Sequence, residues 1–251
     1  MRRKTPSQPL GIHGGDFSEP LHWRAVASIE SAPCDHWGYS LTSVLAISGS
    51  LRKDSYNSAV LRALPQLAPE GMEFDFFEGL AGLPLYSEDL DAAEPPPAVA
   101  RLRAAISAHD GIVIATPEYL HALPGVLKNA IDWASRPLND PAFCGKAVLV
   151  LVATPARVNG FRALADASTL LTGLRNVVVP APEVVVNAAP DIVVPDGNGG
   201  WLIDDPMTRA FIGVQLRILA DLLETGAARA LQSSFQRRTA ELAGLLGRPL
   251  P

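Results

Sequence analysis

The chain has 251 residues, of which 48% are hydrophobic and 6% aromatic, and its net charge is −5. This composition supplies a core for one large domain or two small ones, and the absence of a basic patch argues against nucleic acid as a partner. Two cysteines are too few for a disulfide scaffold, and no apolar run approaches the roughly 20 residues of a membrane span. We therefore expect a cytoplasmic protein that binds neither nucleic acid nor membrane.

The first 41 residues differ from the rest, because Pro, Gly, His and Ser are mixed there without sustained periodicity. We predict that residues 1–41 are a weakly ordered N-terminal extension. Arg2 and Arg3 suggest a twin-arginine export signal, but no apolar segment follows them. Three histidines and a cysteine in this stretch match no standard zinc spacing, so we predict no metal site there: His13, His22, Cys34 and His36.

From Ser43 onward, segments typical of strands alternate with segments typical of helices. Apolar runs predict strands at Ser43–Ile47, Met72–Phe77, Gly111–Ala115 and Ala147–Ala153, with a fifth at either Asn176–Val179 or Val184–Val186. Helices are predicted over Asn57–Leu67, Pro95–His109, Pro124–Ser135, Phe161–Leu174 and Asp205–Thr225, and a further one over Leu231–Leu246.

This alternation predicts an α/β fold with right-handed crossovers between parallel strands. Five strands suggest a flavodoxin-like three-layer α/β/α domain over residues 42–226, with strand order 2-1-3-4-5. Residues 227–251 are then a C-terminal helical extension. In such a sheet ligands bind at the carboxyl ends of the strands, where strands one and three part.

The run from Ser48 to Asn57 joins the first strand to the first helix and is rich in hydrogen-bond donors. Free N–H groups of a first helical turn, together with the helix dipole, favour an anion there. Ser50 and Ser55 add hydroxyl groups, and Asn57 adds an amide at the N-cap position. Arg52 adds a fork of donors that fits a phosphate. With one glycine the loop matches neither the dinucleotide fingerprint nor the P-loop, so we predict a site for one terminal phosphate.

Two further loops fall at the same end of the predicted sheet. Thr116–Gly125 follows the third strand and Thr154–Gly160 follows the fourth, and both are rich in Pro or Gly. Loops of this kind offer backbone N–H and C=O groups to a planar ligand that lies close to them.

Two motifs in these loops resemble one known family. Gly49–Asn57 is similar to the phosphate loop of the NADPH-dependent FMN reductases, and Pro117–Tyr119 followed by Pro124–Trp133 is similar to their second signature. The resemblance covers roughly residues 43–186. It implies bound FMN, reduction by NADPH or NADH as co-substrate, and a homodimer or homotetramer with its site near a subunit boundary.

The same resemblance implies which residues bind the cofactor. Ser50, Arg52, Ser55 and Asn57 match the positions that hold the FMN phosphate. The backbone of the stretch that follows the third strand meets the flavin ring, and the loop after the fourth strand completes the site. The expected additional cofactor-binding residues are Thr116, Pro117, Glu118, Tyr119, Thr154, Asn159 and Gly160. No side chain is expected to act as a catalytic acid or base.

The chain departs from the family pattern at Leu120-His121, where an Asn commonly follows the Tyr. His121 is either a proton donor or a surface residue, and Arg157 either meets a nicotinamide cofactor's phosphate or faces water. Implied electron acceptors are free flavin, a quinone, an azo compound or a metal oxyanion. The alternative function is a flavodoxin-type electron carrier, or an FMN-binding module, without NAD(P)H activity. Flavodoxin phosphate loops are usually Thr-rich and lack an arginine at the position of Arg52.

Overall fold

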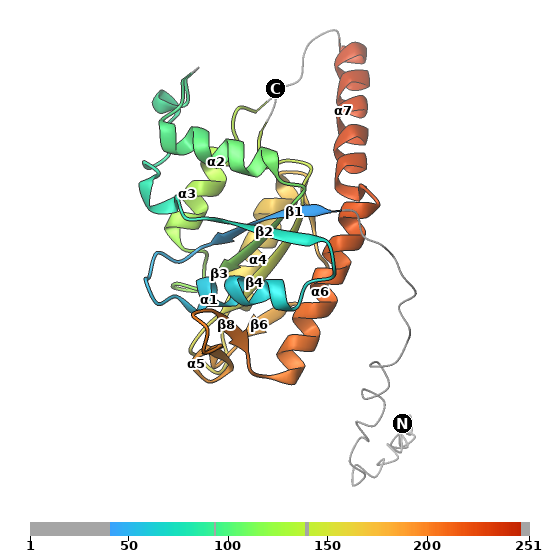
Figure 1. Cartoon of the computed structure of the whole chain (residues 1–251). Helices are drawn as coiled ribbons and strands as arrows, with labels where there is room; N and C mark the ends of the chain where they lie inside the picture. The colour runs from blue at the N-terminus through green and yellow to red at the C-terminus, as the bar shows by residue number, and fades with distance from the viewer. Residues whose placement is uncertain (1–40, 93, 139–140, 247–251) are drawn as a thin grey trace, which may run out of the picture. The chain divides into compact units, whose positions relative to one another are not determined.

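Parallel strands form the centre of the computed structural model, which describes residues 41–92, 94–138 and 141–246 (Figure 1). Strands β1 (Thr42–Ser48), β2 (Met72–Phe77), β3 (Gly111–Thr116) and β4 (Ala147–Ala153) pair in the order β2-β1-β3-β4. Every residue of β3 and β4 is buried, as expected for parallel strands covered on both faces. The predicted strand order is confirmed. The predictions for the N-terminal extension and its histidines concern residues outside the described ranges.

The fifth position of the sheet is divided between two short segments. Both β5 (Val177–Val178) and β6 (Val184–Val186) pair in parallel with β4, so both candidate segments are strands. Pro180 and Pro182 lie between them and have no N–H to donate to a ladder. The buried side chain of Gln215 donates to the carbonyl oxygens of Pro180 (3.1 Å) and Pro182 (2.7 Å), which fixes the break.

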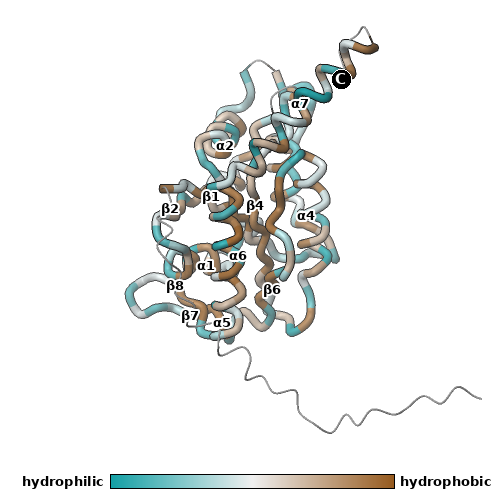
Figure 2. Tube along the Cα trace, turned by 90° about the vertical axis from the view of Figure 1, so that its right-hand side faces the viewer, coloured by the Kyte–Doolittle hydropathy of each residue, from teal (hydrophilic) through white to brown (hydrophobic). Residues whose placement is uncertain are grey.

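Helices cover the two faces of the sheet and form the predicted three layers. On one face, α1 (Tyr56–Ala63) and α6 (Pro206–Glu224) bury residues with Val44 and Ala46 of β1. On the other face, α2, α3 and α4 bury residues with Leu45 and Ile47. These three helices span Pro97–Ala108, Gly125–Ala134 and Phe161–Gly173. Figure 2 shows the strongly apolar trace of β4 and β6 inside the fold.

Several elements differ from the sequence prediction. The first helix ends at Ala63 and is followed by a 3₁₀ segment, η3 (Leu64–Gln66), because Pro65 disfavours a continued α-helix. Two further 3₁₀ segments, η4 and η5, occupy the long connection after β2, at Leu80–Gly82 and Glu88–Leu90.

The segment between β6 and α6 was not predicted to have regular structure. It forms the short helix α5 (Ala189–Ile192) and an antiparallel pair, β7 (Val193–Pro195) and β8 (Trp201–Ile203). The last helix, α7 (Ala227–Leu246), follows α6 and begins earlier than predicted (Figure 1). Among the described residues, no helix is both long and apolar enough to cross a membrane.

Candidate functional site

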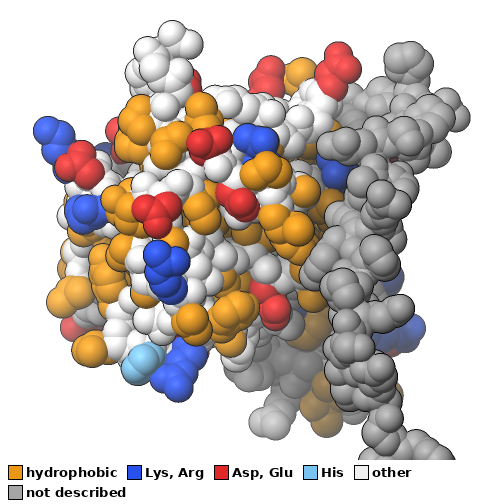
Figure 3. Space-filling view, turned by 90° about the horizontal axis from the view of Figure 1, so that it is seen from below, with side chains coloured by type: hydrophobic (Ala, Val, Ile, Leu, Met, Phe, Trp, Pro, Cys, Tyr) orange, Lys and Arg blue, Asp and Glu red, His pale blue; other side chains and the backbone are white. Residues whose placement is uncertain are grey.

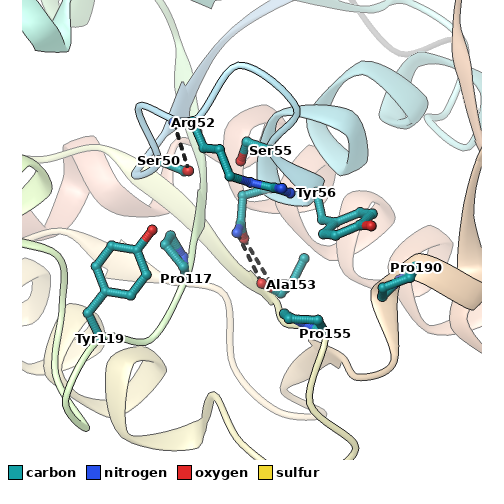
Figure 4. A pocket seen from close by; sticks show the side chains of 10 residues that line it. Ser50, Arg52, Ser55, Tyr56, Pro117, Tyr119, Ala153, Pro155 and Pro190 are labelled. Carbon is teal, nitrogen blue, oxygen red and sulfur yellow. Dashed lines mark hydrogen bonds between the residues drawn. The ribbon is translucent and has the colours of Figure 1, made fainter.

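A cavity of about 450 Å³ lies at the carboxyl ends of β1, β3 and β4 (Figure 4). This is the point at which the strand order reverses, where α/β sheets bind ligands, and the volume suits a small molecule. The lining residues come from four segments that are separate in the sequence: Ser50, Arg52, Ser55, Tyr56, Asn57, Pro117, Tyr119, Ala153, Pro155 and Pro190. Six of the eleven predicted site residues therefore lie together around one cavity.

The loop after β1 is held by its own hydrogen bonds. The Ser50 N–H donates to Ser48 Oγ (3.3 Å), and the Arg52 N–H donates to Ser50 Oγ (3.3 Å). At Gly49 a Cβ atom would lie 2.5 Å from Oγ1 of Thr116, so only glycine allows the loop to approach β3 this closely. These contacts within the chain fix the shape of the loop.

The donors of this loop have the chemistry of a phosphate site. Ser55 is the N-cap of α1 and accepts a hydrogen bond from the Ser58 N–H (3.4 Å). The Arg52 guanidinium lies 5.1 Å from the centroid of the Tyr56 ring. Within the part of the chain that the structure describes, Arg52 is the one charged residue that lines the cavity. A cation, hydroxyl groups and a helix N-terminus together favour a dianionic phosphate.

The role predicted for Asn57 as the N-cap is wrong, because Ser55 occupies that position. Asn57 lies inside the first turn, and its buried amide bonds to the backbone of Ala153 in both directions. Nδ2 donates to the Ala153 oxygen (3.0 Å), and Oδ1 accepts from the Ala153 N–H (2.8 Å). In Figure 4 these two bonds are the pair of dashed lines beside Ala153. Asn57 therefore joins α1 to the end of β4.

The loop after β3 presents alternate residues to the cavity. Pro117 and Tyr119 line it, while the Glu118 side chain between them is directed to the N-terminus of α4. Burial raises the pKa of Glu118, but hydrogen bonds from the Ala163 N–H, His121 and two further N–H groups lower it, and the net pKa is below the ordinary value. The charged form of Glu118 is thus favoured, and this side chain does not line the cavity.

The remaining predicted site residues shape the loops without lining the cavity. The Thr116 hydroxyl donates to the Pro117 oxygen (3.1 Å), and Thr154 Oγ1 accepts from the Ala156 N–H (3.2 Å). The Asn159 N–H donates to Asn187 Oδ1 (3.3 Å). Gly160 is the N-cap residue of α4.

The two residues with alternative predicted roles, His121 and Arg157, also lie outside the cavity lining. Arg157 is exposed, and His121 is exposed with Nδ1 3.4 Å from Glu118 Oε1. Four lining residues were not predicted: Tyr56, Ala153, Pro155 and Pro190. Tyr56 and Pro155 lie within Gly49–Asn57 and Thr154–Gly160, so the position of these loops in the sequence is the signal for both residues. Pro190 belongs to α5, and nothing in its local sequence indicates that it reaches the cavity.

The fold and the cavity together define a flavodoxin-like protein with a cavity at the switch point of its sheet. Residues 42–191 match the model of the NADPH-dependent FMN reductases. The chain therefore belongs to the NADPH-dependent FMN reductase family. This confirms the predicted class, an FMN-dependent oxidoreductase that uses NAD(P)H.

Individual relatives agree with this assignment. An NAD(P)H-dependent FMN reductase of Pseudomonas aeruginosa is 43% identical over 176 residues, which cover 70% of this chain and 92% of the relative. A quinone reductase of Escherichia coli K12 is 40% identical over 162 residues, or 64% of this chain and 85% of that enzyme. A solved flavoenzyme NAD(P)H:acceptor oxidoreductase from Paracoccus denitrificans is 31% identical, with a TM-score of 0.65 over 74% of this chain and 98% of that one.

Proposed function

We propose that this protein binds FMN in the cavity at the ends of β1, β3 and β4 and uses NAD(P)H to reduce a quinone or a flavin. The observation that carries the proposal is the cavity itself, where Arg52, two serine hydroxyls and the first turn of α1 converge. Relatives named quinone reductase and 2-hydroxy-1,4-benzoquinone reductase, the latter 36% identical over 169 residues, support a quinone as the acceptor.

Each part of the cavity has a separate task in this proposal. Ser50, Arg52 and Ser55 hold the phosphate, and the backbone around Pro117 and Tyr119 faces the ring system. When bound, FMN supplies the redox chemistry by taking a hydride from the nicotinamide and passing electrons to the acceptor. None of the described residues that line the cavity is a His, Asp, Glu, Lys or Cys. The side chains therefore bind and orient, and none of them is needed as a general acid or base for hydride transfer.

An anaerobic titration of the FMN-loaded protein with NADPH, followed by a panel of acceptors, tests the proposal. We expect rapid bleaching of the flavin, then rapid reoxidation by a benzoquinone or free FMN. A flavin that stays oxidised with NADPH and NADH, but accepts electrons from a chemical reductant, would instead identify an electron carrier. Cofactor released by heat and identified by chromatography should be FMN, and FAD as the main species would contradict the site assignment.

We further propose that the protein assembles as a homodimer or homotetramer in the cytoplasm. Large apolar side chains are exposed in the loops beside the cavity and at the start of α4, including Leu51, Val158 and Phe161. Figure 3 shows one face of the molecule, on which apolar side chains gather between charges of both signs. Such exposed groups favour contact with a second copy. Light scattering coupled to size-exclusion chromatography checks the assembly.

A further inference from the structure

Helix α4 has no capping side chain of its own. Its N-cap residue is Gly160, which adopts a left-handed conformation with φ of 109°. A Cβ atom at this position would lie 2.7 Å from Cγ1 of Val152 and 2.8 Å from Cγ1 of Val185. Both the backbone angle and the close packing therefore require glycine here. Ser, Thr, Asp or Asn, which cap most helices, cannot occupy this position.

Glu118, on a different loop, supplies the missing cap. Its Oε2 accepts hydrogen bonds from the N–H groups of Gly160 (3.1 Å), Arg162 (3.0 Å) and Ala163 (3.2 Å). The side chain is only 6% exposed. A buried carboxylate that accepts three N–H groups at a helix N-terminus forms charge-assisted bonds and complements the helix dipole. These bonds link the loop after β3 to the start of α4.

The residues next to Glu118 in the sequence belong to the lining of the cavity. Pro117 and Tyr119 line the cavity on either side of it in sequence. Beyond Tyr119 the chain makes a tight turn closed by two reciprocal bonds of 3.1 Å between Tyr119 and Ala122. Leu120 and His121 have φ angles of 49° and 64° in this turn, a left-handed conformation that is unfavourable for both residues. A loop with this conformation needs a restraint from outside itself.

We propose that Glu118 is a positioning residue, whose carboxylate caps α4 from another loop and so holds Pro117 and Tyr119 in place for the flavin. The proposal rests on the cavity being the FMN site. It assigns the side chain a role without contact to the cofactor, because Glu118 is not among the lining residues. It also implies that the N-terminus of α4 is already occupied by an anion, so that it is closed to a phosphate of NADPH.

Two substitutions of Glu118 and one matched control test the proposal. Glu118→Ala removes all the bonds, while Glu118→Gln keeps a neutral acceptor oxygen. The control is Asp205→Ala, because Asp205 caps α6 within its own helix, by accepting from the Thr208 N–H (2.7 Å), and does not line the cavity. The measurements are the FMN dissociation constant by fluorescence, the KM for NADPH and kcat at saturating FMN, the circular dichroism of the bound flavin, and the Tm.

We expect Glu118→Ala to bind FMN about tenfold more weakly, with an altered flavin circular dichroism spectrum and a raised KM for NADPH. Glu118→Gln should recover most of the affinity, to within roughly threefold of the unaltered chain, since neutral hydrogen bonds are about half as strong. It also supplies the test if Glu118→Ala does not fold. Asp205→Ala should lower the Tm and leave FMN affinity, KM and the flavin spectrum unchanged.

A lower Tm in Glu118→Ala with unchanged FMN affinity, KM and flavin spectrum would overturn the inference, because the cap would then be merely structural. If only Glu118→Gln folds, its FMN affinity and flavin spectrum become the test. The inference is then overturned when both are identical to those of the unaltered chain. Failure of the proposed function is a distinct result, since the unaltered chain would then take up no FMN.

Discussion

At the scale of single residues, Arg52 is the side chain whose removal has the clearest expected effect. Arg52→Ala removes a charge-assisted fork to the phosphate, typically about 1.5–3 kcal/mol, or roughly ten- to a hundredfold in affinity. The rate of flavin reduction by NADPH at saturating FMN should fall far less, because the role proposed for Arg52 is to bind the phosphate and not to take part in hydride transfer. Stopped-flow absorbance at saturating FMN measures that rate.

A matched control for Arg52 lies on the following helix. Arg62→Ala removes the same charge, but Arg62 is paired with Glu78 (3.1 Å) away from the cavity-lining residues. Its FMN affinity should equal that of the unaltered chain. If the rate of flavin reduction by NADPH fell a thousandfold in Arg52→Ala, this side chain would take part in the chemistry.

Leu120 carries a conformational strain that a substitution should relieve. Its side chain is 98% exposed and its φ is 49°, so little packing is lost when it is replaced. Asn tolerates the left-handed region better, and Leu120→Asn should raise the free energy of unfolding by about 1 kcal/mol and the Tm by about 2–4 °C. Val158→Asn is the control, since Val158 is also exposed but has no positive φ. Equal Tm values for both variants would mean that the turn is unstrained.

Residue roles could be predicted where the partners are local in sequence. Ser50, Arg52 and Ser55 could be predicted to lie together because loop, cation and cap follow one another directly, and all three line the cavity. Asn57 and Glu118 were assigned to the cofactor, yet they bond to backbone groups 96 and 42 residues away. No local pattern encodes such a distant partner. These contacts therefore became visible only in the folded chain, and the role of both residues in binding FMN stays a prediction.

At the scale of secondary structure, the Asn57 amide joins α1 to β4, and its loss should destabilise the fold. Asn57→Ala leaves the buried N–H and C=O of Ala153 unpaired, which should lower the free energy of unfolding by about 2–4 kcal/mol. Asn57→Asp should not restore stability, because its second oxygen would face the Ala153 carbonyl. Urea denaturation with an unchanged m-value measures the loss.

Ser58→Ala is the matched control for the Asn57 variants. Ser58 lies on the same helix, and its hydroxyl bonds to Ser48 Oγ (2.9 Å) instead of to β4. Its loss should lower the free energy of unfolding by less than about 1.5 kcal/mol. A loss in Asn57→Ala no larger than in Ser58→Ala would contradict the assigned role of the amide.

The two helix caps predict how stability depends on pH. Hydrogen bonds from the hydroxyl and the N–H of Thr208 lower the pKa of Asp205, and the pKa of Glu118 is lowered as well. A carboxylate with a depressed pKa adds stability that is present above its unfolded-state pKa, about 4, and is lost as the pH falls through the folded-state value. Unfolding followed from pH 7 downward should thus show a loss of stability below about pH 4. The double variant Glu118→Gln/Asp205→Asn should show a shallower loss, and parallel curves would contradict this.

The predictability of each element follows from how strongly its burial appears in the sequence. The runs of β3 and β4 are apolar throughout because both faces are covered, so they were located correctly. The pair β7 and β8 has three residues per strand and includes Pro195. Segments this short contain too few residues for an alternating pattern, and the hairpin was missed.

At the scale of the whole molecule, the division into an N-terminal extension, a flavin domain and a C-terminal helical extension stays a prediction. A chain shortened to residues 39–251 should fold and bind FMN with unchanged affinity. The reason is that the sheet begins at Thr42, whose N–H donates to the Gly71 oxygen (2.8 Å). Circular dichroism and an FMN titration check this. Insolubility, or failure to take up FMN, would show that the first residues complete the core or a subunit contact.

The divided edge of the sheet has a consequence for the chain in concentrated solution. An uninterrupted edge strand exposes a row of N–H and C=O groups on which another molecule can add a strand, which begins aggregation. Here β5 has two residues and β6 has three, and the prolines that interrupt them offer no donors. Gln215 keeps the interruption in place by occupying both proline carbonyls. This edge is therefore a poor template for intermolecular β-pairing, which protects the protein from aggregation at high protein concentration.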